Sequence, residues 1–317
     1  MLADLKFVQG AVAKKDYDPT LTHFCIRDGK ILGYNGALAL CTPTDLPLTC
    51  APKAVQFVKA VQTCRDTVEM HLTPNGRLCV RSGSFTAHVE CLADVEYPNV
   101  APEGQIVELP KGDLLGALNA LSPFVGQDAS RSWARGILLR GQSAYATNNI
   151  IAIEKWLGYH FPVDVNIPEE AVDELLRIGK EPTQIQLGQN SVTFHFGNNQ
   201  WLRSQLLTVE WPDVSRILDR QSTCKPLPEG FFQALHDLMP FVDDMTRVFF
   251  HDGEVSTVPL EGIGASVKVP GIPEGGCYNI KQLLHLEGTV REIDFSMFPD
   301  PCIFYGDKIR GAIVGMR

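Results

Sequence analysis

No stretch of the 317-residue sequence approaches 18 consecutive apolar residues, the shortest run that reads as a membrane-spanning helix. The first residues, MLADLK, also lack the basic region, apolar block and small-residue cleavage site of a secretory signal. Long tracts of a single residue are absent too, and 44% of the residues are apolar, which is enough for a folded core. These absences predict an unexported, cytoplasmic protein with no membrane partner.

Cysteine is present but not in any pattern that carries chemistry. Nine cysteines are scattered singly along the chain, and no two of them form a C-x-x-C pair. An odd number without ligand spacing fits neither a disulfide framework nor a zinc site. The sequence therefore predicts free thiols in a reducing compartment, with no metal and no cofactor.

Catalytic motifs are missing as well. The sequence contains no H-E-x-x-H, no G-x-x-x-x-G-K-[ST] and no G-x-S-x-G. The pair Asp243-Asp244 is better explained as a solvated helix end, and Gly262-Ile263-Gly264 lies in an alternating strand region rather than before a helix. We therefore predict no catalytic residue; an enzyme that uses one of the cysteines or histidines stays as a minor alternative.

What the sequence does contain is an internal repeat. Residues 95–100 read VEYPNV and residues 209–214 read VEWPDV, and each follows a segment with the alternating pattern of paired strands. Three hairpin-like turns carry Gly29, Gly141 and Gly253 at a constant spacing of 112 residues. A period that appears three times predicts three copies of one α+β domain, over residues 1–108, 109–220 and 221–317.

Each predicted copy has two amphipathic helical segments. Apolar residues recur at helical spacing, and the segment after Pro52 places Val55, Val58 and Val61 inward and Lys53 and Lys59 outward. The six predicted helices cover residues 2–13, 52–64, 111–122, 168–180, 228–242 and 279–286.

Repeated domains in a fixed order favour a closed ring, because a head-to-tail contact with the right rotation must close. The formal charge of −9 argues against a protein that coats nucleic acid over its whole surface. A ring around DNA needs only weak phosphate contacts, since each cation adds salt-sensitive attraction. The repeat thus favours topological attachment to DNA over adhesive binding.

With this triple repeat and these helices, the chain resembles the bacterial DNA polymerase III β subunit, the sliding clamp. The resemblance extends over essentially the full length and is strongest at residues 77–83 (RLCVRSG) with 95–100, 145–148 (YATN), 194–218 and the final Met316-Arg317. The chain is shorter than typical members, which fits a divergent or virus-encoded clamp. The resemblance implies a DNA clamp fold, with helices on the inner face and antiparallel sheets on the outer face of a head-to-tail homodimer ring.

The resemblance also implies which residues face DNA and which bind partners. The partners are duplex DNA, the DNA polymerase, the clamp loader and other proteins that carry short clamp-binding motifs. The inner-facing cations would be Lys6, Lys14, Lys15, Lys53, Lys59, Arg131, Arg177, Lys180 and Lys281. A motif-binding pocket between the second and third domains would be formed by Ala134, Thr147, Asn149, Ile150, Ile151, Pro212, Arg216, Ile217, Ala312, Ile313, Val314 and Met316.

One edge of that pocket departs from the family pattern. Where the family has a Gly-His-Arg run, this chain has Asn148-Asn149-Ile150-Ile151 and is one residue shorter, which makes the pocket more apolar. An alternative function keeps the fold but not the ring: a non-encircling adaptor or decoy that binds clamp-binding motifs. The negative charge and the acidic residues in 168–180 favour this alternative slightly.

Overall fold

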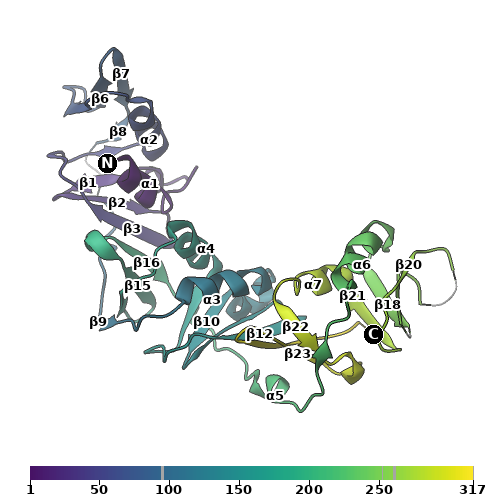
Figure 1. Ribbon diagram of the computed structural model, residues 1–317. Helices are drawn as coiled ribbons and strands as arrows, with labels where there is room; N and C mark the ends of the chain where they lie inside the picture. Colours follow the sequence, from purple (N-terminus) through teal and green to yellow (C-terminus); the bar gives the residue numbers. More distant parts are fainter. Residues whose placement is uncertain (94–95, 252, 260–261, 317) are drawn as a thin grey trace. The chain divides into compact units, whose positions relative to one another are not determined.

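The computed structural model describes residues 1–93, 96–251, 253–259 and 262–316 and forms two compact units (Figure 1). Unit 1 comprises Met1–Lys111 with Glu170–Leu206, and unit 2 comprises Gly112–Glu169 with Leu207–Arg317. The middle predicted domain, 109–220, therefore contributes to both units, and the three domain bounds stay a prediction. Val95 of the repeated hexapeptide, Asp252 of the third turn and the terminal Arg317 lie outside the described residues.

Unit 1 is built on a seven-stranded sheet in which every neighbouring pair is antiparallel. The strand at residues Leu38–Pro43 lies inside this sheet and is almost entirely buried, as expected of the apolar run LALCT. The strand order is β1 (Cys25–Arg27), β2 (Lys30–Tyr34), β3 (Leu38–Pro43), β16 (Trp201–Gln205), β15 (Ser191–His195), β14 (Gln184–Leu187) and β9 (Gln105–Glu108). Unit 1 also contains two smaller sheets. One pairs β4 (Ala51–Pro52) with β8 (Cys91–Leu92), and the other has the strand order β5 (Glu69–Leu72), β6 (Leu78–Ser82) and β7 (Phe85–Val89).

Three helices pack in unit 1: α1 (Leu2–Gln9), α2 (Ala54–Thr63) and α4 (Glu169–Ile178). Helix α1 lies against β2, β3 and α2 (Figure 1). Each helix is shorter than predicted. In α2, Pro52 belongs to β4 rather than to the first helical turn, and the buried face is centred on Phe57 and Val58, with Val55 only half-buried.

Unit 2 contains an eight-stranded sheet and a four-stranded sheet, both antiparallel throughout. The larger sheet runs β13 (Val165–Pro168), β10 (Gly136–Arg140), β11 (Ser143–Thr147), β12 (Ile151–Trp156), β24 (Ile309–Ile313), β23 (Cys302–Gly306), β22 (Val290–Ile293) and β17 (Lys225–Pro226). The smaller sheet runs β20 (Ser266–Lys268), β19 (Glu254–Ser256), β18 (Arg247–His251) and β21 (Gly276–Asn279).

The helices of unit 2 are α3 (Leu114–Leu121), α5 (Ser215–Leu218), α6 (Phe231–Leu238) and α7 (Ile280–Leu284). Helix α3 begins later than predicted because Asp113 is its N-cap and accepts a hydrogen bond from the Gly116 amide at 3.0 Å. Helices α6 and α7 pack together over an aromatic core in which the rings of Phe250 and Tyr278 lie 4.9 Å apart. No helix among the described residues combines the length and the apolar character needed to cross a bilayer.

Short 3-10 helices complete the described chain. They are Pro19–Thr22, Ser122–Phe124, Ala129–Ala134, Gly197–Asn199, Met239–Phe241 and Phe295–Met297. The predicted helix 228–242 therefore ends early. Its α-helical part stops at Leu238, and residues 239–241 form a 3-10 helix, because Pro240 cannot continue an α-helix.

The three repeated turns are confirmed as two-residue β-hairpins. Glycines 29, 141 and 253 have φ values of 67°, 57° and 73°, the left-handed region that such turns require and that glycine adopts without strain. The strand residues that close the turns are paired as Arg27 with Lys30, Arg140 with Ser143, and His251 with Glu254. The period found in the sequence therefore corresponds to a repeated structural element.

Helix α4 is held against the C-terminal end of α1 by a buried carboxylate. The Glu174 side chain is only 8% exposed and forms an ion pair with Arg177. The Arg177 guanidinium also donates hydrogen bonds to the carbonyl oxygens of Lys6 (3.2 Å) and Phe7 (2.8 Å). Gly10 caps α1 at the same place, and a Cβ on this residue would overlap the Glu174 carboxylate. This contact fixes the position of α4 within unit 1.

A Gly10→Ala substitution should lower the free energy of unfolding by about 2 kcal/mol, because the added methyl group overpacks against Glu174. Urea unfolding measures this change. The matched control is Gly197→Ala in the same unit, where a Cβ meets nothing within 4 Å and φ is not positive. Equal midpoints for the two variants would contradict the contact.

Candidate peptide pocket and nucleic-acid interface

One face of the eight-stranded sheet carries a continuous row of side chains around the junction of β12 and β24. Cross-strand pairing places Tyr145 opposite Glu154 and Glu154 opposite Arg310. Since side chains alternate between faces, Thr147 and Ala312 lie on this same face, two residues along their strands. The sheet thus presents a mixed polar and apolar surface at the join between two repeats.

Helix α5 and the segment before it cover that surface. Leu218 packs with Ile303 and Ala312 in a buried cluster, and Val214 and Ile217 contact it from the same segment. Tyr145, Cys224 and Met297 complete the apolar contacts. The repeated hexapeptide therefore leads directly into a short helix that is anchored on this face of the sheet.

A cavity of about 190 Å³ remains between this segment and the β10–β11 hairpin. Its walls include Tyr145 and Leu138 from the sheet, Trp211 and Pro212 from the covering segment, and Arg310 from β24. Such a volume accommodates one or two side chains rather than a cofactor. The cavity is therefore a small groove with room for side chains of a ligand.

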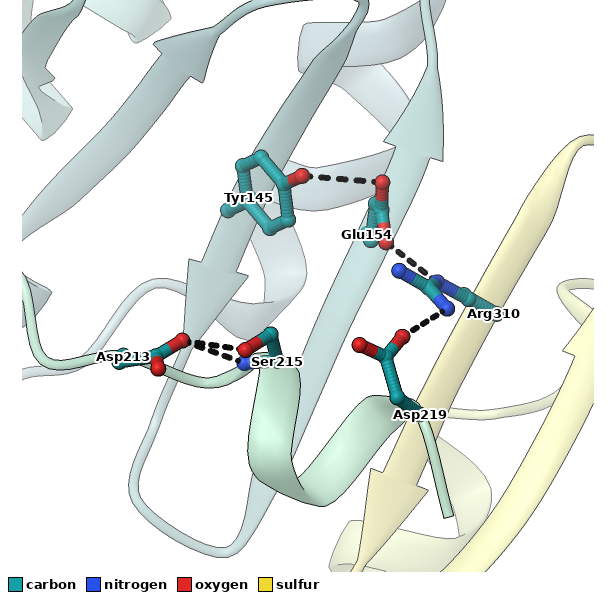
Figure 2. A network of polar contacts seen from close by, with 6 residues as sticks. All are labelled: Tyr145, Glu154, Asp213, Ser215, Asp219 and Arg310. Carbon is teal, nitrogen blue, oxygen red and sulfur yellow. Dashed lines mark hydrogen bonds and ion pairs between the residues drawn. The ribbon is translucent and has the colours of Figure 1, made fainter. Parts of the chain in front are cut away.

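A polar network forms the floor of this groove (Figure 2). The Tyr145 hydroxyl donates to Glu154 Oε1 at 3.0 Å, and Arg310 bridges Glu154 and Asp219 through its Nε and Nη1 atoms, with 2.7 Å from Nη1 to Asp219 Oδ1. Burial and the neighbouring Glu154 carboxylate raise the pKa of Tyr145 to about 12, so its hydroxyl stays a donor. Asp213 accepts from both the amide (3.0 Å) and the hydroxyl (2.6 Å) of Ser215 and so fixes the turn that leads into α5.

The structure brings together only part of the predicted pocket. Ala312 belongs to the buried cluster and Ile217 packs against it, Pro212 lines the cavity, and Thr147 lies on the same sheet face as Ala312. Arg216 is exposed on α5. These five predicted residues therefore lie at or beside this join, and their role in a pocket stays a prediction.

The remaining predicted pocket residues lie elsewhere around the join. Ile151 and Ile313 are paired with each other, have no exposed surface, and point to the opposite face of the sheet from Thr147 and Ala312. Ala134 is buried, 1% exposed, in a 3-10 helix. Asn149 adopts a positive φ of 74° in the β11–β12 turn.

The end of β24 carries the last two predicted residues toward solvent. The Val314 amide donates to the carbonyl of Ile150 at 2.9 Å, and the Met316 amide donates to that of Cys277 at 2.7 Å. Val314 is 41% exposed, and Ile150 and Met316 are half-buried. These residues form an apolar rim beside the turn in which the sequence departs from the family pattern.

Sequence reasoning missed Tyr145, Leu218 and Val214. Strand alternation gives a signal for Tyr145, which lies two residues before Thr147 and hence on the same face. Leu218 follows Ile217 in a four-residue helix that is too short to produce a periodic pattern. Its role depends on contacts between segments distant in the sequence.

The predicted DNA-facing cations are mostly exposed and lie on or beside helices. Lys6 is exposed on α1, Lys59 on α2 and Lys281 on α7, whereas Lys53 is a half-buried N-cap of α2. Over residues 1–93, 96–251, 253–259 and 262–316, no ion pair with a carboxylate involves the following cations: Lys6, Lys14, Lys15, Lys53, Lys59, Arg131, Lys180 and Lys281.

Arg177 differs from the other predicted cations. Its guanidinium is paired with Glu174 and hydrogen-bonded to the end of α1, so it is already committed to packing within unit 1. In the part of the chain that the structure describes, His, Cys, Asp and Glu side chains form no group of three that could hold a metal ion.

These sheets and helices define the α+β DNA clamp fold, as predicted. The chain is similar over its whole length to solved bacterial sliding clamps. The β sliding clamp of C. crescentus gives a TM-score of 0.84 at 16% identity, covering 100% of this chain and 96% of that chain.

Two further structures give the same result. The DNA polymerase III subunit beta of Pseudomonas aeruginosa gives a TM-score of 0.82 at 18% identity, with 100% and 97% of the two chains covered. The sliding clamp of Bacillus subtilis gives 0.80 at 19% identity, with 100% and 96% covered. No protein-family model and no curated protein matches the sequence. The three-dimensional fold is thus shared although the sequences have diverged widely.

Replacing Arg310 by Met should lower the free energy of unfolding by about 1–2 kcal/mol, because Glu154, which is 13% exposed, would lose its cationic partner. Thermal and urea unfolding measure the loss. The control is Arg140→Met, whose pair with Asp164 is 46% and 55% exposed and should contribute less than about 0.5 kcal/mol. Adding Glu154→Gln to Arg310→Met should recover part of the loss; no recovery would argue against the network.

Proposed function

We propose that this protein is a DNA sliding clamp: a head-to-tail homodimer ring that encircles duplex DNA and tethers the replicative polymerase, the clamp loader and other motif-bearing proteins. The observation that carries the proposal is the clamp fold over 100% of the chain. The proposed role is non-catalytic, because attachment would come from topology and from peptide docking, and the proposed location is the cytoplasm.

The distribution of cations supports a DNA-facing surface on the helices. Lys6 on α1 and Lys59 on α2 are exposed on two helices that pack together, and Lys281 is exposed on α7. None of these lysines is neutralised by a carboxylate within the described residues. A few unpaired lysines give weak, salt-sensitive attraction to phosphate, which suits a ring that must slide.

Free sheet edges support self-assembly. The four-stranded sheet of unit 2 ends at β20 and β21, and the three-stranded sheet of unit 1 ends at β5 and β7. Unpaired edge strands are templates for pairing with another chain. Phe241 and Met245, which precede β18, are 62% and 55% exposed, as expected for apolar residues that a second copy covers. These edges suit a contact between unit 1 of one copy and unit 2 of another.

The groove at the β12–β24 join supports partner docking. It is lined by apolar side chains from the sheet and from the covering segment, with Arg310 and Tyr145 as fixed polar groups. Apolar pockets with few oriented polar groups are typical sites for short linear motifs. We propose that the polymerase and clamp-loader motifs bind at this groove and extend toward the apolar rim formed by Ile150, Val314 and Met316.

Encirclement predicts retention that depends on DNA topology. After assembly on nicked circular DNA by a clamp loader, the protein should remain bound through gel filtration and should be lost when a restriction enzyme linearises the circle. Sedimentation of the free protein should show a species of twice the 35.0 kDa chain mass. Retention that ignores free ends, or a 35.0 kDa species alone at micromolar concentration, would instead favour the non-encircling adaptor.

Substituting Lys6 and Lys59 together by Gln should weaken DNA binding without unfolding the protein, because both side chains are exposed. The slope of log K against log salt concentration should become shallower by roughly 2, about 0.9 for each lost phosphate contact. The control is Lys225→Gln on edge strand β17, which is exposed but lies on no helix. An unchanged slope in the double variant would exclude these two lysines from the DNA interface.

A further inference from the structure

The sheet of unit 1 contains a counterpart of the row that forms the floor of the groove. Cross-strand pairs run from Cys25 to Leu32, from Leu32 to Cys41 and from Cys41 to Trp201. In unit 2 the corresponding pairs run through Leu138, Tyr145, Glu154 and Arg310. Both rows begin in the repeated hairpin and end on a strand from a later part of the chain.

The covering segment is repeated as well. Pro98, Asn99 and Val100 belong to the first copy of the hexapeptide and line a cavity of about 320 Å³ over the unit 1 row. Pro212, Asp213 and Val214 occupy the same place over the unit 2 row. The internal repeat has therefore produced two grooves, one in each unit.

The two floors differ in chemistry. In unit 2 the third and fourth positions are the ion pair of Glu154 and Arg310. In unit 1 they are Cys41, which is buried, and Trp201, which is half-buried. A thiol and an indole offer an apolar, aromatic surface, so the larger cavity favours an apolar or aromatic side chain.

The rims also differ. Arg140 beside the unit 2 cavity is neutralised by Asp164. Arg27 and Lys30 beside the unit 1 cavity are exposed, and neither forms an ion pair with a carboxylate in the portion of the chain described. Among the residues that the structure describes, Asp28 is the one acidic residue that lines this cavity, so these residues give the rim an excess of positive charge in a chain of net charge −9. That excess complements a carboxylate on an incoming ligand.

We propose that the unit 1 groove is a second docking site, which binds a short peptide segment of a partner protein that carries an aromatic side chain next to a carboxylate. The aromatic side chain packs on Trp201 and Leu32 beneath Pro98, and the carboxylate lies at Arg27 and Lys30. The site is complete within one copy of unit 1, so it does not require a ring or DNA.

The probe that tests this is the capped peptide acetyl-Gly-Asp-Phe-Gly-amide, with acetyl-Gly-Asn-Phe-Gly-amide as its uncharged match. Nitrogen-proton NMR of the intact chain resolves the indole signals of its four tryptophans, each assigned with a single Trp→Phe variant. The Asp peptide should shift the Trp201 signal saturably, and the Asn peptide should bind about fivefold more weakly. The double variant Arg27→Gln, Lys30→Gln should bind the two peptides with equal affinity, and its spectrum without peptide should remain that of a folded protein.

Three results would overturn the proposal. These are a shift confined to the Trp211 signal, which places the peptide only in the unit 2 groove; equal affinity for the two peptides; and no saturable shift at millimolar peptide. The experiment uses no DNA, so its failure is distinct from a failure of retention on nicked circles.

Discussion

Antiparallel pairing between strands of different repeats is the constraint on which the rest of the structure depends. Strand β3 pairs with β16 through four residue pairs in unit 1, and β12 pairs with β24 through five in unit 2. Both β3 and β12 end a three-stranded meander, and a buried strand with a free edge would leave its amide and carbonyl groups unsatisfied. The first two repeats therefore each complete a sheet with a later part of the chain, which explains why the compact units cut across the repeat.

The grooves follow from this joining. Where a sheet passes from one repeat to the next, the connecting hexapeptide must leave the sheet and cross its face, and the side chains of the joined strands become a floor. The floor residues are cross-strand neighbours, so a change at one position alters the partner that its neighbour needs. Glu154 with Arg310 and Cys41 with Trp201 are two solutions to the same packing problem. The two grooves therefore share a strand pairing pattern but differ in the chemistry of their floors.

The features that the sequence predicted correctly depend on residues close together in the chain. The hairpins at Gly29, Gly141 and Gly253 depend on a backbone conformation of a few residues, and helical periodicity located six helices to within a few residues. The strand joins, the anchoring of α5 by Leu218 and the position of Ile151 depend on contacts between distant segments. Glu174 shows the limit of prediction from local pattern. An acidic residue on an amphipathic helix is expected to be exposed, yet Glu174 is buried. Gly10 has no side chain and leaves space for the carboxylate, and Arg177 neutralises its charge.

The distinction between Arg177 and the lysines bears on how a chain of net charge −9 can work on DNA. Arginine, with a planar fork of donors, is used here to fix helices and strands, as at Glu174 and at Glu154 with Asp219. Lysines on the helices are left unpaired, and a flexible ammonium gives non-directional attraction that no single phosphate can trap. Rigid ion pairs thus preserve the scaffold. In the ring proposed above, the unpaired lysines would meet the DNA, and little net positive charge would be needed because closure, rather than affinity, would prevent escape.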